Sequence, residues 1–102
     1  MYIRYNHCSN HLIKGCIINK FKYHGIPETQ LDIGYASTKK EYIQLYNNID
    51  IALDPFPYNS HTVANECLWM SVPLITLKGD TYASRVGYSM LKHLELDELI
   101  AE

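Results

Sequence analysis

Apolar residues recur along the chain in two rhythms, one typical of strands and one typical of helices. Short runs rich in β-forming residues predict strands at residues 2–5, 31–36, 49–53 and 73–77. Apolar spacings of three and four residues predict helices that begin near residue 10, at Thr38, at Thr62 and at Ser84. Residues 96–101 either extend the last helix or form a short separate one.

The predicted order of elements is βαβαβαβα. This alternation predicts an α/β fold with a Rossmann-like parallel sheet and flanking helices. The length of 102 residues suits one domain, and 47% hydrophobic residues are ordinary for a globular chain. The net charge is −2 and the nine Lys and Arg residues are scattered, which argues against a nucleic-acid partner. No apolar run approaches the roughly 20 residues of a membrane span, so no membrane partner is expected.

The three cysteines form no paired spacing. Cys16 and Cys67 fall on apolar helix faces, where a free thiol behaves as a small hydrophobe, and Cys8 is left over. No signal peptide precedes the first predicted strand. These features predict a reducing compartment and a cytoplasmic location. His7, Cys8 and His11 have ragged spacing and no fourth ligand nearby, so no zinc site is predicted.

Polar side chains gather where the predicted strands end and the next helices begin. Ligands of open parallel sheets bind at this edge. The first backbone N–H groups of the helix from Thr62 lack intrahelical partners and, with the helix dipole, can hold a phosphate. Asp54, followed by a Pro-Phe-Pro turn, is expected to shape that turn. The polar residues at this edge are Ser37, Lys39, Asn59, Ser60, His61, Thr62 and Lys78.

Each candidate also has a plain structural interpretation. His61 is either a ligand or a solvated loop residue, and Thr62 and Ser60 either contact phosphate or cap the helix, with capping favoured for Ser60. Glu66 either accepts hydrogen bonds from a ribose diol or complements the helix dipole. Lys39 is either a nucleoside contact or a surface charge. Tyr42 and Trp69 lie on or beside apolar stripes, so packing is the expected role of both, with stacking on a base as the alternative for Tyr42.

Three stretches together resemble the O-linked N-acetylglucosamine transferase family, including its bacterial SPINDLY-like members. The stretches are DIALDPFPYNSHT at 50–62, ECLWMSVPLITLKG at 66–79 and ASRVG at 83–87. The strongest similarity runs from about Asp50 to Ala101. A weaker one reaches back through IGY at 33–35 and KEY at 40–42 to the first strand.

This resemblance implies a two-domain GT-B glycosyltransferase that moves N-acetylglucosamine from UDP-N-acetylglucosamine to protein Ser or Thr hydroxyls without a metal. Residues 1–102 would be a single partial UDP-sugar-binding domain, part of the C-terminal half of the catalytic region. Ser60 stands where the family usually has Gly and Val63 where it usually has Thr, which removes a hydroxyl from the phosphate site. By position, the resemblance implies diphosphate contacts for His61 and Thr62, a ribose contact for Glu66, backbone uracil contacts for Ala36 and Ser37, and nucleoside contacts for Lys39 and Tyr42.

The resemblance assigns no catalytic residue to these 102 positions. The upstream catalytic half and the first strand of the domain are expected elsewhere, so the isolated chain is predicted to be inactive. An incomplete sheet also invites strand addition, which would let the chain self-associate. Two alternatives remain: a non-catalytic nucleotide-binding or assembly module that needs a partner chain, and a remnant without a ligand.

Overall fold

The computed structural model describes residues 1–4 and 11–102. The chain divides into two compact units, Met1–Tyr42 and Ile43–Glu102, and each is described by itself. The predictions that concern Tyr5, the helix start near residue 10 and the His7–Cys8 pair lie outside the described residues.

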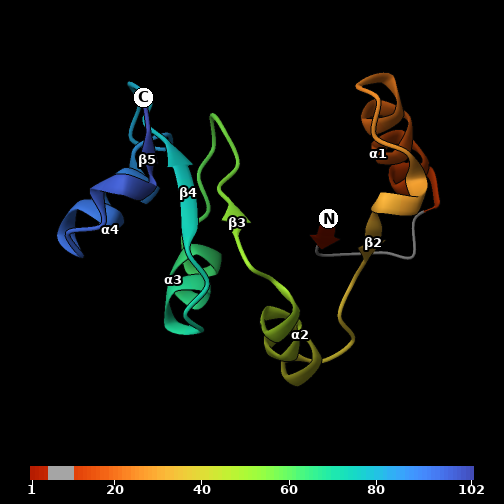
Figure 1. Cartoon of the computed structure of the whole chain (residues 1–102), viewed down its shortest axis with the longest axis horizontal. Coiled ribbons are helices and arrows are strands. Elements are labelled where there is room, and N and C mark those ends of the chain that lie inside the picture. Colours follow the sequence, from red (N-terminus) through yellow and green to blue (C-terminus); the bar gives the residue numbers. More distant parts are fainter. Residues whose placement is uncertain (5–10) are drawn as a thin grey trace. The chain divides into compact units, whose positions relative to one another are not determined.

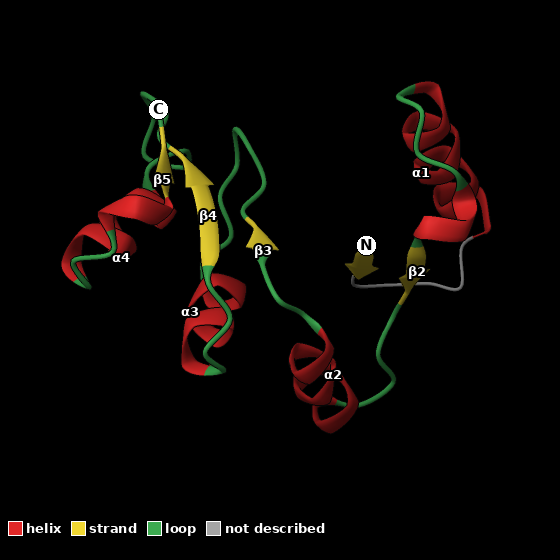
Figure 2. Ribbon diagram, in the orientation of Figure 1, coloured by secondary structure: helices red, strands yellow, loops and turns green. Residues whose placement is uncertain are grey.

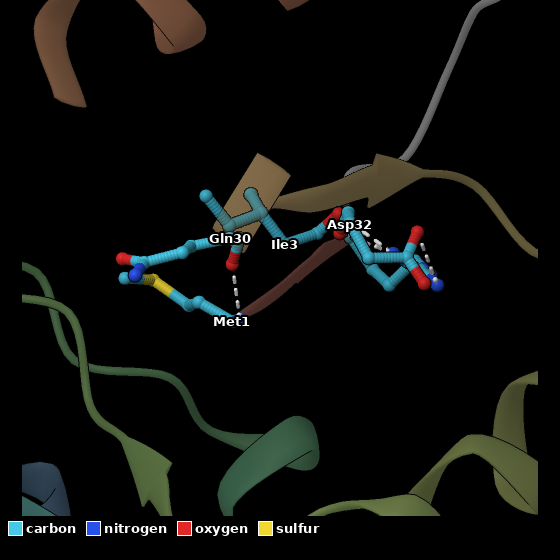
Figure 3. Close-up of polar contacts among 5 residues, drawn as sticks. Met1, Ile3, Gln30 and Asp32 are labelled. Carbon is cyan, nitrogen blue, oxygen red and sulfur yellow. Dashed lines mark hydrogen bonds and ion pairs between the residues drawn. The ribbon is translucent and has the colours of Figure 1, made fainter. Parts of the chain in front are cut away.

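The first unit is built around a pair of parallel strands. β1 and β2 pair with Ile3 opposite Ile33, and Ile33 is buried. Arg4 forms an ion pair with Asp32 at 3.2 Å, and the Met1 ammonium donates a hydrogen bond to the Gln30 carbonyl at 2.7 Å (Figure 3). The elements are β1 (Tyr2–Arg4), α1 (His11–Tyr23), the 3-10 helix η1 (Glu28–Gln30), β2 (Asp32–Gly34) and the first part of α2 (Lys39–Leu45).

The second unit is a three-stranded parallel sheet with β4 at its centre (Figures 1 and 2). Ala52 lies opposite Leu74 on one side of β4, and Thr76 lies opposite Ile100 on the other. Both α3 and α4 contact β4. After the end of α2, the elements are η2 (Tyr46–Asn48), β3 (Ala52–Leu53), α3 (Thr62–Trp69), β4 (Leu74–Leu77), α4 (Val86–His93), η3 (Asp97–Leu99) and β5 (Ile100–Ala101).

The apolar core of the second unit lies around β4. Leu74 of β4 and Leu91 of α4 are fully buried, and Ala64 and Cys67 of α3 are buried as well. Burial raises the pKa of the Cys67 thiol more than a hydrogen bond with Tyr46 lowers it. The fold therefore favours the protonated thiol. The core fixes the ends of β3 and β4, from which the candidate site is built.

The α/β class and the parallel strands are confirmed, while several details differ from expectation. The described strands form two small sheets. Residues 100 and 101 form a strand, although a helix was predicted there; only the short η3 before them is helical. Trp69 is 88% exposed and does not pack, because it lies about 200° around α3 from the buried Cys67. Cys16 is exposed and not on a buried helix face.

Candidate functional site

The start of α3 carries three of the predicted contact residues. His61 is the N-cap residue and Thr62 the first helical residue, and both are exposed. Glu66 lies one turn further along and is half-buried. No side chain of the N-cap makes a capping hydrogen bond, so the first-turn N–H groups keep their capacity to bind an anion.

The two polar residues before His61 face inward, which corrects the predictions for both. Asn59 has no exposed surface and therefore cannot reach a ligand at the rim. Its amide donates to the Pro55 carbonyl at 3.0 Å and accepts from the Gly87 N–H at 3.3 Å. Ser60 does not cap α3, because its hydroxyl donates to Asp54 at 2.8 Å.

Asp54 is the centre of this inward-facing network. Its Oδ1 accepts two hydrogen bonds from Ser60, one from the backbone N–H and one from the hydroxyl, each at 2.8 Å. Its Oδ2 accepts one from the buried Thr76 hydroxyl at 2.8 Å. The prediction that Asp54 shapes the turn after β3 is confirmed, and the network extends it by tying the turn to β4.

Close packing of α4 completes the network. A Cβ on Gly87 would overlap Asp54 Oδ2 and lie 2.5 Å from Thr76 Oγ1, so only glycine fits there. The preceding loop is fixed in a similar way, because a Cβ on Gly79 would overlap the buried Ser84 side chain. Ser84 was expected to cap α4, but its hydroxyl bonds Thr81 and the N-cap is Arg85.

Aromatic and cationic side chains from the loop after β4 lie beside this region. The sequence indicated Lys78 at this edge of the sheet, but not Tyr82 or Arg85. The Tyr82 ring lies 6.2 Å from the His61 ring, centroid to centroid. Lys78 and Arg85 both lie over the Tyr88 ring, at 5.0 and 5.2 Å from its centroid. Within residues 1–4 and 11–102, neither cation has a carboxylate within ion-pair distance.

The remaining predicted contact residues belong to the first unit, so the structure does not place them relative to His61 and Thr62. Lys39 begins α2 and is exposed, and Tyr42 is half-buried on the same helix. Thr38 caps α2, since its Oγ1 accepts a hydrogen bond from the Glu41 N–H at 3.2 Å. Glu41 also accepts the Ser37 N–H at 2.9 Å, so a uracil contact through that N–H would have to displace Glu41. Ala36, the other predicted uracil contact, is half-buried.

The described part of the chain lacks both a metal site and a helix that could span a membrane. No group of three His, Cys, Asp or Glu residues there is arranged to hold a metal ion. None of its helices is both long and apolar enough to cross a membrane.

Comparisons with known proteins converge on one family. The sequence pattern of glycosyl transferase family 41 matches residues 4–102. A probable UDP-N-acetylglucosamine–peptide N-acetylglucosaminyltransferase SPINDLY from Solanum lycopersicum is 43% identical over 61 residues, 60% of this chain and 7% of that protein. The corresponding protein from Eustoma exaltatum subsp. russellianum is 37% identical over 79 residues, 76% of this chain and 9% of that protein. The chain thus spans less than a tenth of the length of these relatives.

A solved structure gives the same result. A mutant O-GlcNAc transferase from Thermobaculum terrenum matches 99% of this chain, and 19% of its own, with a TM-score of 0.93 and 28% sequence identity. This likeness identifies the fold of the chain as part of a GT-B architecture.

Proposed function

Since the chain belongs to glycosyl transferase family 41, we propose that it forms the donor-nucleotide-binding portion of a UDP-N-acetylglucosamine-dependent protein O-glycosyltransferase. The observation that carries this proposal is the start of α3, where His61 and Thr62 are exposed and no side chain caps the helix. Ser60 and Asn59, which have the side chains best suited to capping, are both held elsewhere. The first-turn N–H groups therefore remain available for the donor diphosphate.

The leaving UDP is the group that this site would stabilise. In a direct displacement at the anomeric carbon, negative charge develops on the diphosphate as the bond to the sugar breaks. Backbone N–H groups, the Thr62 hydroxyl and the His61 imidazole N–H would donate hydrogen bonds to it, which lowers the barrier. These donors need no metal ion, and we propose that none takes part.

The nucleoside would extend away from the diphosphate. Glu66, one turn along α3, would accept hydrogen bonds from the ribose diol. We propose the uracil and nucleoside contacts for Ala36, Ser37, Lys39 and Tyr42 of the first unit. Val63, exposed in the first turn of α3, supplies no hydroxyl to the diphosphate.

Transfer itself would need more than this portion. The named relatives are peptide N-acetylglucosaminyltransferases, and the chain spans less than a tenth of them. We propose that the protein Ser or Thr acceptor and the catalytic groups are contributed by segments outside these 102 residues. The isolated chain is therefore expected to bind UDP without transferring sugar.

The free thiols of Cys16 and Cys67 are relevant to the cellular compartment of the chain. Cys67 is buried and Cys16 is exposed, and both are free. An exposed thiol persists where the surroundings are reducing. We propose a cytoplasmic location on this ground.

Replacing His61 by Ala is expected to weaken UDP binding about tenfold, the effect of losing one hydrogen bond to a charged group. Titration of the chain with UDP, followed by amide chemical shifts in NMR spectra, measures the dissociation constant. His93→Ala is the matched control, since His93 is another exposed histidine, in the last turn of α4. A folded wild-type chain that shows no saturable shifts with UDP would contradict the proposal.

A second candidate function is an assembly module. Leu53 on the edge strand β3 is 72% exposed and the neighbouring Ile51 is 57% exposed, which favours a strand partner on that edge. Light scattering of the chain across a range of concentrations separates the two candidates. A mass that doubles with concentration, together with no response to UDP, would favour the module.

A further inference from the structure

Asp54 is a buried charge in the second unit, and the fold surrounds it with donors. The residue is 9% exposed, and its two carboxylate oxygens accept three hydrogen bonds. Burying a carboxylate is costly unless such bonds replace its water. Gly87, the second residue of α4, lies against Oδ2, so the helix dipole of α4 adds favourable positive potential.

The residues that surround this carboxylate come from three places in the chain. Ser60 belongs to the loop that leads into α3, Thr76 to β4, and Gly87 to the first turn of α4. The hydrogen bonds are divided between the two oxygens: Oδ1 accepts both bonds from the loop, and Oδ2 accepts the bond from the sheet. One side chain thus joins the loop before His61 to β4.

We propose that Asp54 is a positioning residue for the donor site, acting through Ser60 on His61 and Thr62. The inference rests on the proposed function, because it concerns the same diphosphate contacts. Ser60 is bonded through both its N–H and its hydroxyl, so neither its backbone nor its side chain is free to rotate. His61 follows directly, and its ring position and the first N–H groups of α3 are set by where Ser60 is held.

Asn59 holds the other side of the same loop. It bonds the Pro55 carbonyl within the loop and the Gly87 N–H of α4, and its own N–H donates to the Ala83 carbonyl at 2.8 Å. We expect these bonds to keep the loop folded when the Asp54 charge is altered. The effect of an Asp54 variant should therefore appear at Ser60 and His61 more than in the fold as a whole.

The test compares Asp54→Asn and Asp54→Ala with the wild-type chain in UDP titrations. The amide of Asn keeps an acceptor for Ser60 but loses the charge, so we expect binding about threefold weaker. Alanine removes every acceptor, so we expect binding at least tenfold weaker. The Thr62 amide shift at saturating UDP should also shrink in the order wild type, Asn, Ala, because it reports the geometry of the bound state in folded molecules.

Two further variants separate positioning from stability. Val72→Ala removes apolar packing from the buried core, outside the hydrogen-bond network of Asp54. It should lower the melting temperature and leave the UDP dissociation constant and the Thr62 shift at their wild-type values. Ser60→Ala removes the hydroxyl bond and keeps the N–H bond, so it should fold and bind UDP about twofold to threefold more weakly; it replaces the Asp54 variants should they fail to fold.

The outcomes distinguish this inference from the proposed function. The positioning role is overturned if the wild-type chain binds UDP and the Asp54 and Ser60 variants show the same dissociation constant and the same Thr62 shift at saturation. That result leaves the proposed donor site unchanged. The positioning role is also overturned if Val72→Ala weakens UDP binding as much as Asp54→Ala does. A wild-type chain that does not bind UDP rejects the proposed function, and the positioning role with it.

Discussion

Replacing Gly87 by Ala is expected to lower the free energy of unfolding by about 3–5 kcal/mol. The added Cβ would overlap Asp54 Oδ2 and the Thr76 hydroxyl, which hydrogen-bond each other in a buried site. Relieving the overlap costs about 1–3 kcal/mol for overpacking, and separating the two partners costs a similar amount for unsatisfied buried groups. In a chain of this size the melting temperature should fall by about 15 °C or more.

Thermal unfolding followed by circular dichroism measures the effect of Gly87→Ala. Gly15→Ala is the control, because Gly15 lies inside α1 and a Cβ there meets no atom within 4 Å. Alanine favours helix over glycine, so this variant should be as stable as the wild type or gain up to about 1 kcal/mol. Equal melting temperatures for the Gly87→Ala and wild-type chains would show that α4 can move away from the Asp54 carboxylate at little cost.

The contrast between these two glycines shows what sequence periodicity can reveal. Apolar spacing located the helices and the strands β1 to β4, because burial of one face repeats with the period of each element. It could not separate Gly15 from Gly87, since both occupy helical positions. Only the tertiary approach of α4 to Asp54 makes one of them irreplaceable.

The same limit explains the strand at 100–101. Two residues carry no readable alternation, and Ile100 continued the apolar pattern of the preceding helix. Its strand state comes from pairing with Thr76 in β4, a partner 24 positions away in the chain. Pairing of this kind depends on tertiary context that intrinsic propensity does not encode.

At the candidate site, the sequence indicated the position better than the direction of each side chain. His61 and Thr62 lie exposed at the start of α3, as the phosphate-binding hypothesis requires. Ser60 and Asn59 have similar polar chemistry but face inward, because Asp54, Pro55 and Gly87 offer them partners. A helix N-terminus rich in polar residues can therefore contain both exposed donors for a ligand and residues whose hydrogen bonds hold the loop in place. Only the fold distinguishes the two kinds.

Replacing Asn59 by Ala is expected to lower the free energy of unfolding by about 3 kcal/mol, because Asn59 has a structural role and does not contact the ligand. The variant removes both side-chain bonds, one to the Pro55 carbonyl and one from the Gly87 N–H. The Gly87 N–H is buried and would have no replacement partner, which costs about 1–3 kcal/mol, and the cavity left by the fully buried amide adds to this. Urea unfolding at constant pH measures the change.

The matched control for this prediction is Asn65→Ala, a change at an exposed asparagine on α3. Its stability should equal that of the wild type or rise slightly, because alanine is the better helix former. Asn59→Ala should also loosen the loop that carries His61, so faster exchange of the Ser60 amide is expected before any global unfolding. If the two asparagine variants unfold at the same urea concentration, the two side-chain bonds of Asn59 do not stabilise the fold.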